Sequence, residues 1–194
     1  GTTTATVLAQ ALGMDQILYD NLRDCAPLHD IGKIGISDMI LKKTFPRLTD
    51  QERNIMKGHT VIGAQLFNPP DSMLDEMSLQ VALHHHDRWD GGPSGYPGKI
   101  ELSQFSIKDG VVPESEPISG TEIPLCARIV AVADVFDALS HKRCYKESWT
   151  IEDSFNEIEK NSGTQFDPEV VKAFLQVRSR ICSIQLAFPD EAED

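Results

Sequence analysis

Capped helical segments follow one another along most of the chain, and this pattern constrains the fold more than any other feature. Thr49 is followed three residues later by Glu52, and Thr150 by Asp153. In this arrangement the two side chains satisfy backbone N–H groups at the start of a helix. Strand-type alternation, with apolar side chains at every second position, is hard to find. The sequence therefore predicts an all-α protein.

The expected helices are spread from the first residues to the end of the chain. The segment after Thr121 is apolar on most sides, which indicates a central position in a helical bundle. Asp167 precedes a proline, which is typical of a helix start. We expect helices over residues 7–12, 15–28, 49–66, 72–83, 121–139, 150–163 and 167–178.

Length and composition indicate one domain with a long loop. The chain has 194 residues, which fits a single domain. We expect the helical domain to occupy residues 1–187 and an acidic tail to follow at 188–194. Residues 91–120 are rich in Gly, Pro and Ser and predict a long loop or insertion, in which residues 108–111 could form a small hairpin. Because the sequence starts with Gly1 rather than Met, we interpret it as excised from a longer multidomain protein.

The net charge limits which ligands the protein can bind, and the cysteines indicate the cellular compartment. Lys and Arg number 18 against 30 Asp and Glu, a net charge of −12. This sign excludes a sequence-independent binder of long nucleic acid, but not one small phosphorylated ligand held by local cations or metal ions. No apolar stretch approaches the roughly 18 residues of a membrane span, and no signal peptide opens the chain. The four cysteines are scattered, so we expect buried free thiols rather than disulfides, in the cytoplasm.

The histidines are grouped, and this grouping predicts a metal site. Five of the six histidines lie in three short motifs on or at the ends of expected helices. A lone histidine is more often a core or surface residue, and a lone buried carboxylate is more often salt-bridged, but the set together favours metal ligands. Mixed imidazole and carboxylate ligands suit Fe, Mn, Zn, Ni or Co, and a shared carboxylate can bridge two ions for phosphodiester hydrolysis. The candidate ligands are His29, Asp30, His59, His85, His86 and Asp134.

The order of these motifs resembles a known family. Residues 29–33, His-Asp-Ile-Gly-Lys, resemble the signature of the HD phosphohydrolase superfamily. Residues 85–91, followed by Gly95-Tyr96-Pro97, resemble its HD-GYP subfamily. The resemblance extends over residues 5–178, nearly the whole chain. It implies an all-α helical bundle of the HD-domain type and a metal-dependent enzyme that hydrolyses cyclic di-GMP to pGpG or GMP.

The resemblance also implies a role for each matching residue. Two divalent ions, Fe or Mn, are expected, with Asp30 shared between them. The first ion would be held by Asp30, His59, His85 and His86, and the second by His29, Asp30 and Asp134.

Further residues are implied to act on the substrate. Lys33 would contact the scissile phosphate or protonate the leaving oxygen, beside the catalytic Asp30. Arg143 and Lys146 match positions that hold phosphate oxygens. Gly95, Tyr96 and Pro97 would shape the rim of the pocket and could recruit signalling partner proteins. A homodimer is also compatible with the resemblance.

The sequence departs from the family pattern in three places. No histidine precedes His29, whereas family members usually carry one on the preceding helix, so the second metal site is one ligand short. Asp87 stands where the family usually has Glu, and residues 100–119 resemble an insertion. The insertion could act as a lid, narrow the pocket or bind a partner. Two other functions stay open: an impaired module that senses cyclic dinucleotides or binds proteins, and a hydrolase of another cyclic dinucleotide.

Overall fold

The computed structural model describes residues 3–44, 46–105, 112 and 114–187, and its regular structure over these residues is helical throughout. This confirms the all-α prediction. The helices are α1 (Thr4–Ala11), α2 (Gln16–Cys25), α3 (Asp38–Leu41), α4 (Asp50–Lys57), α5 (His59–Gln65), α6 (Met73–His84), α7 (Leu125–His141), α8 (Ile151–Lys160), α9 (Pro168–Gln176) and α10 (Arg178–Ala187). Short 3₁₀ turns lie at Ala26–Leu28, Ile31–Gly35, Leu102–Gln104, Gly120–Glu122 and Lys142–Cys144.

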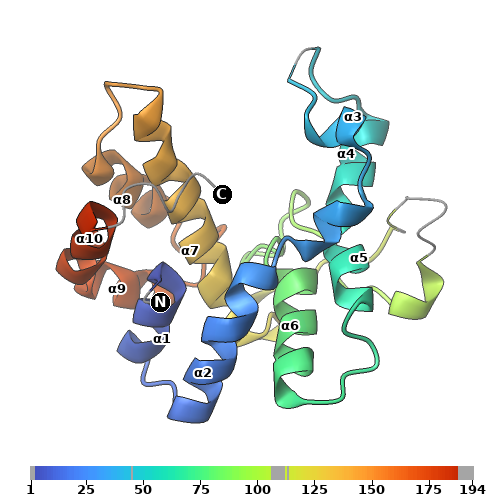
Figure 1. Ribbon diagram of the computed structural model, residues 1–194, viewed down its shortest axis with the longest axis horizontal. Helices are drawn as coiled ribbons and strands as arrows, with labels where there is room; N and C mark the ends of the chain where they lie inside the picture. The colour runs from blue at the N-terminus through green and yellow to red at the C-terminus, as the bar shows by residue number, and fades with distance from the viewer. Residues whose placement is uncertain (1–2, 45, 106–111, 113, 188–194) are drawn as a thin grey trace.

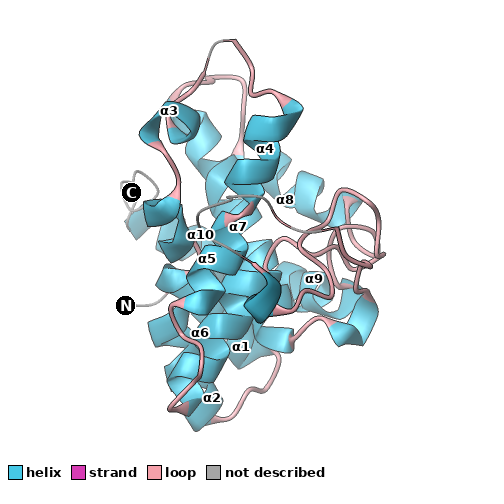
Figure 2. Cartoon of the chain, turned by 90° about the vertical axis from the view of Figure 1, so that its right-hand side faces the viewer, coloured by secondary structure: helices cyan, strands magenta, loops and turns pink. Residues whose placement is uncertain are grey.

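Two hydrophobic clusters hold these helices together. In the larger cluster, α1, α2, α6 and α7 pack against one another, and α8, α9 and α10 cover one side of them (Figure 1). The rings of Phe136, Phe155 and Phe174 meet at its centre, with centroids 4.8 to 5.0 Å apart. The smaller cluster lies between α5, α6 and the segment that follows α2. Helices α3 and α4 project from this end of the molecule as an arm (Figure 2).

The predicted helix starts are present in the structure. Both capping boxes form, since Thr49 and Thr150 each exchange hydrogen bonds with the residue three positions later. Asp167 caps α9 by accepting from the N–H of Glu169. Helix starts could be predicted from the sequence because a capping side chain and the backbone N–H that donates to it lie within one turn.

Four predicted helix boundaries were wrong. The helix from Asp15 ends at Cys25, since Pro27 next along the chain has no N–H to donate and a 3₁₀ turn follows. The central helix begins at Leu125 rather than after Thr121, because Pro124 disfavours the helical conformation at Ile123, which is extended. The last expected helix ends at Gln176 rather than Arg178, and a further helix, α10, follows it that the sequence did not predict.

The fourth wrong boundary lies at Gly58, which separates α4 from α5 within the expected helix 49–66. Two carbonyls that a continuous helix would use internally instead accept side-chain hydrogen bonds. The Met56 carbonyl accepts from His59 Nδ1 at 2.7 Å, and the Lys57 carbonyl accepts from Thr60 Oγ1 at 2.9 Å. Such local bonds compete with the helical ladder. His59 therefore opens a new helix instead of continuing an old one.

The described part of the long loop is fixed to the helices at several points. Phe105 is buried in the smaller cluster, and Gln65 Nε2 donates to the carbonyls of Leu102 and Phe105 at 3.1 and 3.2 Å. The expected hairpin at 108–111 and the acidic tail lie outside the described residues.

The cysteines differ in how deeply they are buried. All four cysteines are free, as predicted. Cys25 and Cys126 are buried, but Cys144 is exposed, so the expectation of buried thiols was wrong for this residue. It follows α7 in a surface turn. Among the described helices, none is long and apolar enough to cross a membrane.

Candidate metal centre

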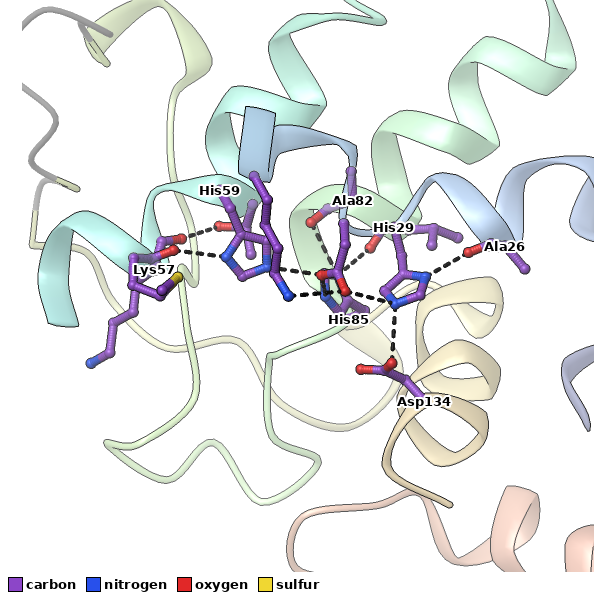
Figure 3. Close-up of polar contacts among 12 residues, drawn as sticks. Ala26, His29, Lys57, His59, Ala82, His85 and Asp134 are labelled. Carbon is purple, nitrogen blue, oxygen red and sulfur yellow. Dashed lines mark hydrogen bonds and ion pairs between the residues drawn. The ribbon is translucent and has the colours of Figure 1, made fainter. Parts of the chain in front are cut away.

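Four separate parts of the chain bring the six candidate ligands to one place, and Figure 3 labels His29, His59, His85 and Asp134 among them. His29 and Asp30 lie between two 3₁₀ turns after α2, and His59 is the first residue of α5. The two neighbouring histidines, His85 and His86, follow the last residue of α6, and the acidic side chain of Asp134 comes from the middle of α7. Helix ends and turns thus supply most of the ligands, and the central helix supplies the last.

A glycine allows the first of these segments to reach α5. A Cβ atom at Gly32 would lie 1.8 Å from the carbonyl oxygen of His59 and 2.5 Å from the backbone nitrogen of Gly63. Both neighbours are backbone atoms, which cannot rotate away. Only glycine fits at this position, and the close approach places Asp30 against His59.

The ligand atoms form two groups, each with all its atoms within 4.8 Å of one another. The first group contains the residues expected for the first ion, namely Asp30, His59, His85 and His86. The second group contains His29, His85 and Asp134. It differs from the expected second set because His85 takes the place of Asp30.

Asp30 lies between the two groups and turns one oxygen toward each. Its Oδ1 is 3.3 Å from His59 Nε2 and 3.5 Å from His85 Nε2. Its Oδ2 is 3.2 Å from His29 Nε2 and 3.3 Å from Lys33 Nζ. A carboxylate in this position can give one oxygen to each of two ions.

Backbone carbonyls orient three of the imidazoles. The Nδ1 atom of His29 lies 2.6 Å from the carbonyl of Ala26, and that of His59 lies 2.7 Å from the carbonyl at position 56. The Nδ1 atom of His85 lies 2.9 Å from the carbonyl of Val81. A carbonyl only accepts, so each Nδ1 donates, and in the neutral ring the lone pair is on Nε2, facing the centre. Histidines that bind metals are held in this way.

The buried Nε2 atoms test whether the residues fit a metal. His59 is 2 % exposed and His85 is 3 % exposed. Their Nε2 atoms have no hydrogen-bond partner among the described residues. A buried polar atom without a partner is costly, and these two face a carboxylate oxygen that is also an acceptor. A cation between them would satisfy all three, so the donor set fits a divalent ion.

The electrostatics of the cluster keep its carboxylates ionised and favour the binding of a cation. Burial would raise the pKa of Asp30, but the imidazoles of His29, His59 and His85 outweigh it and lower this pKa well below its usual range. The pKa of Asp134 is lowered too, since His29 outweighs burial. Burial and the neighbouring imidazoles lower the pKa of His86 to about 3. Two anionic carboxylates and a neutral His86 are suited to cation binding.

His29 carries the opposite shift. Burial opposes its protonation, but Asp134 at 3.0 Å and then Asp30 raise its pKa to about 10. Without another cation, His29 therefore supplies the positive charge that the two carboxylates require.

The structure brings Lys33 to the centre but not the other two predicted cations. The Lys33 ammonium contacts Asp30, and its side chain is 45 % exposed, so it can reach a ligand from the solvent side. Arg143 and Lys146 are exposed in the turn after α7, more than two helical turns beyond Asp134. Neither has a hydrogen bond or ion pair to a described residue of the metal cluster.

The segment Gly95-Tyr96-Pro97 lies beside the cluster, as expected for a pocket rim. The Tyr96 ring stacks on His86 with centroids 4.7 Å apart and an interplanar angle of 17°. The Tyr96 N–H donates to the His86 carbonyl at 3.2 Å. Gly95 is required by close approach, since a Cβ there would lie 2.7 Å from the backbone nitrogen of Arg88.

Asp87 is a structural residue of the site whose role the sequence reasoning missed. Its Oδ1 accepts from the N–H of Gly98 at 2.9 Å, and its Oδ2 lies 2.7 Å from His84 Nδ1. Asp87 is buried and so fixes the loop after Tyr96 against the end of α6. Its position directly after the paired histidines could have indicated a role in the site. In the sequence analysis it stands only as a departure from the family pattern.

Comparison with known proteins identifies the family. The sequence profile of the HD domain matches residues 3–139, and a second HD domain profile matches residues 114–170. The chain belongs to the HD domain family.

Curated relatives of this HD domain chain are named as cyclic-dinucleotide phosphodiesterases. A cyclic di-GMP phosphodiesterase of Thermotoga maritima is 40 % identical over 184 residues, covering 95 % of this chain and 44 % of the relative. The cyclic di-GMP phosphodiesterase response regulator RpfG of Xanthomonas campestris is 40 % identical, covering 91 % of this chain and 41 % of the relative. A 3'3'-cGAMP-specific phosphodiesterase 2 of Vibrio cholerae is 34 % identical, covering 94 % and 31 %.

A solved structure supports the fold. The cyclic GMP-AMP specific phosphodiesterase V-cGAP3 of V. cholerae matches with a TM-score of 0.65 at 19 % identity, covering 94 % of this chain and 43 % of that one. At this identity the likeness shows the shared HD-domain fold alone. The chain spans less than half the length of each of these relatives.

Proposed function

We propose that this HD domain is a metal-dependent phosphodiesterase that hydrolyses cyclic di-GMP to pGpG or GMP. The observation that carries the proposal is the pair of adjacent ligand groups, toward each of which Asp30 turns one oxygen, with imidazoles already oriented for metal binding. The names of the relatives supply the substrate class.

Each ligand is assigned to one of two ions according to its place in the cluster. Asp30, His59, His85 and His86 hold the first ion, and His29, Asp134 and the second oxygen of Asp30 hold the other. Two divalent ions, Fe or Mn, would supply an activated water and neutralise charge on the phosphate. The first set has four protein ligands, two of which, His59 and His85, are almost fully buried, so it binds its ion more tightly than the second set of three.

Lys33 acts on the reacting phosphate from the solvent side. Its ammonium is held by Asp30 Oδ2 at 3.3 Å and remains 45 % exposed. A cation in this place stabilises charge that develops on the phosphoryl oxygens, and its proton is available to the leaving oxygen.

Arg143 and Lys146 bind a phosphate that does not react. Both are exposed and lie beyond the metal ligands along the chain from α7. A cyclic dinucleotide has two phosphodiesters, so a cation pair away from the metals would hold the second one. Tyr96, which stacks on His86, forms the wall between the metals and the loop.

Turnover by the metal-loaded chain tests this proposal. The chain is purified without oxygen, loaded with Fe²⁺ or Mn²⁺ and given cyclic di-GMP and 3'3'-cGAMP in separate reactions. We expect cyclic di-GMP to be converted to pGpG or GMP, faster than 3'3'-cGAMP, and only when metal is present. Binding of cyclic di-GMP without hydrolysis would indicate a sensing module. Preferred hydrolysis of 3'3'-cGAMP would overturn the substrate assignment but not the phosphodiesterase.

A further inference from the structure

A small pocket lies against the metal ligands. It measures about 150 Å³, and its walls include the ligands His85, His86 and Asp134. Its lining also includes groups that can donate hydrogen bonds, from Arg88, Ser94 and Gln165. A pocket lined both by metal-ligating acceptors and by donors suits a phosphate ester, whose free oxygens only accept.

Gln165 comes from a turn between α8 and α9 that is fixed to the loop after α6. The Gln165 carbonyl accepts from the N–H of Trp89 at 3.2 Å, and the Thr164 carbonyl accepts from the N–H of Asp90 at 2.9 Å. Within the turn, Gly163 N–H donates to the Phe166 carbonyl at 2.8 Å. The backbone that carries Gln165 is therefore held on both sides of the side chain.

A buried ion pair fixes the same turn from behind. Asp167 Oδ2 is 2.6 Å from Arg128 Nη1, and the Arg128 guanidinium lies over the Trp89 ring. The Asp167 carboxylate also caps α9. These contacts join α7, α9 and the loop after α6 around Gln165, so its position at the pocket is set before any ligand arrives.

The guanidinium of Arg88 is already hydrogen-bonded to a carboxylate, whereas the carboxamide of Gln165 is available to a ligand. Arg88 gives Nε and Nη2 to Asp90, both at 3.0 Å. The Gln165 side chain is half-buried and forms no side-chain hydrogen bond to another described residue. It lines the same pocket as the metal ligands His85, His86 and Asp134, so its N–H groups are free for a ligand there.

We propose that Gln165 is a substrate-binding residue that donates its side-chain amide to a phosphate oxygen of the cyclic dinucleotide beside the metals. The inference rests on the proposed function and adds a contact from a part of the chain that contributes no metal ligand. A neutral amide suits this position, because a further carboxylate would repel the phosphate.

Binding measurements on matched variants test the inference. Lys33→Ala is used as a common background to slow turnover, and the metal-loaded chain is titrated with cyclic di-GMP. Gln165→Ala removes the donor, and Gln165→Glu replaces it with an acceptor of the same shape. Gln176→Ala, an exposed glutamine on α9, is the control. Metal content and helix content are measured for every variant.

The expected results separate the donor role from general damage. Gln165→Ala should weaken binding by roughly 10- to 150-fold, as for one hydrogen bond to a charged group. Gln165→Glu should weaken it further, while Gln176→Ala has no effect. In the protein that retains Lys33 and can turn over substrate, Gln165→Ala should mainly raise KM for cyclic di-GMP.

Two outcomes overturn the inference while leaving the proposed function in place. One is unchanged binding by Gln165→Ala, and the other is Gln165→Glu binding as well as the parent. If the parent chain neither binds nor hydrolyses cyclic di-GMP, the proposed function fails first, and the Gln165 contact fails with it.

Discussion

His59 shows most clearly how one residue can serve packing and chemistry together. It is almost fully buried and opens α5, and its Nδ1 is tied to the Met56 carbonyl. Its Nε2 faces Asp30 without a hydrogen-bond partner among the described residues. We expect His59→Ala to lose the first ion and all metal-dependent turnover while the helix content barely changes.

Ile62, one turn further along α5, is the matched control for His59. It is buried in the smaller hydrophobic cluster and is not a ligand. Ile62→Ala should lower the free energy of unfolding by about 2 to 5 kcal/mol and keep the metal. Elemental analysis and thermal unfolding distinguish the two variants. Full metal content in His59→Ala would remove His59 from the ligand set.

The cysteines offer a second prediction at this scale. Burial raises the pKa of Cys25 to about 12 and that of Cys126 to about 11, so neither thiol is ionised near neutral pH. Cys144 is exposed. Iodoacetamide should alkylate Cys144 in the folded protein and reach Cys25 and Cys126 only after unfolding. Peptide mass spectrometry gives the three rates, and equal rates for Cys25 and Cys144 would contradict this packing.

Residue type decided which parts of the site could be predicted. His85, His86 and Asp134 were predicted from the sequence because neighbouring imidazoles and a carboxylate in an apolar helix occur together with other His motifs, although each alone more often has a structural role. Gln165 gave no such signal, since a glutamine in a polar turn is ordinary. Its place beside the metals depends on how α8 and α9 pack, which local sequence does not encode.

At the scale of elements, the contact between the turn after Asp30 and α5 is the most demanding in the site. We expect Gly32→Ala to push this turn away from the His59 carbonyl, because the new Cβ would otherwise lie 1.8 Å from it. The result should be loss of metal and of activity, with a lower melting temperature.

Gly35 is the control for this backbone contact. A Cβ at Gly35 would meet only side-chain carbons of Ile62, at 3.1 Å. Those atoms can move slightly, so Gly35→Ala should keep its metal and lose little stability. Metal content and melting temperature are compared for both variants. Equal behaviour would mean that the close backbone approach is not what positions Asp30.

Helix starts and helix breaks differed in how well they could be predicted. The boxes at Thr49 and Thr150 depend on neighbours three residues apart and were predicted correctly. The break at Gly58 depends on His59 and Thr60 taking backbone carbonyls, which in turn depends on His59 being drawn into the cluster. A tertiary interaction therefore decided this boundary, and no local pattern announces it.

At the scale of the whole molecule, the metal centre draws its ligands from both hydrophobic clusters, which α6 already links. Asp134 belongs to the helix at the centre of the larger cluster, and His59 belongs to α5 beside the smaller one. Bound ions would therefore cross-link the two clusters and stabilise the fold as a whole.

Metal removal should lower the melting temperature. At a free metal concentration 100-fold above Kd, binding adds about 2.7 kcal/mol to the free energy of unfolding. For a chain of this size that corresponds to roughly 5 to 10 °C. Calorimetry with Mn²⁺ and with excess EDTA measures the shift, and His59→Ala should show a much smaller one. An equal shift in both proteins would place the stabilising ion elsewhere.

The distribution of the ligands along the chain also determines when the metal site is completed during folding. The first ligand is His29 and the last is Asp134, so the set spans most of the sequence and belongs to no local fragment. Contacts this distant in sequence form late in folding, after the helices themselves. During synthesis, the segment up to α6 leaves the ribosome with its imidazoles exposed and the set unfinished. The ligands of the proposed first ion are all present once His86 has emerged, whereas those of the second ion are complete only after α7 has docked and supplied Asp134.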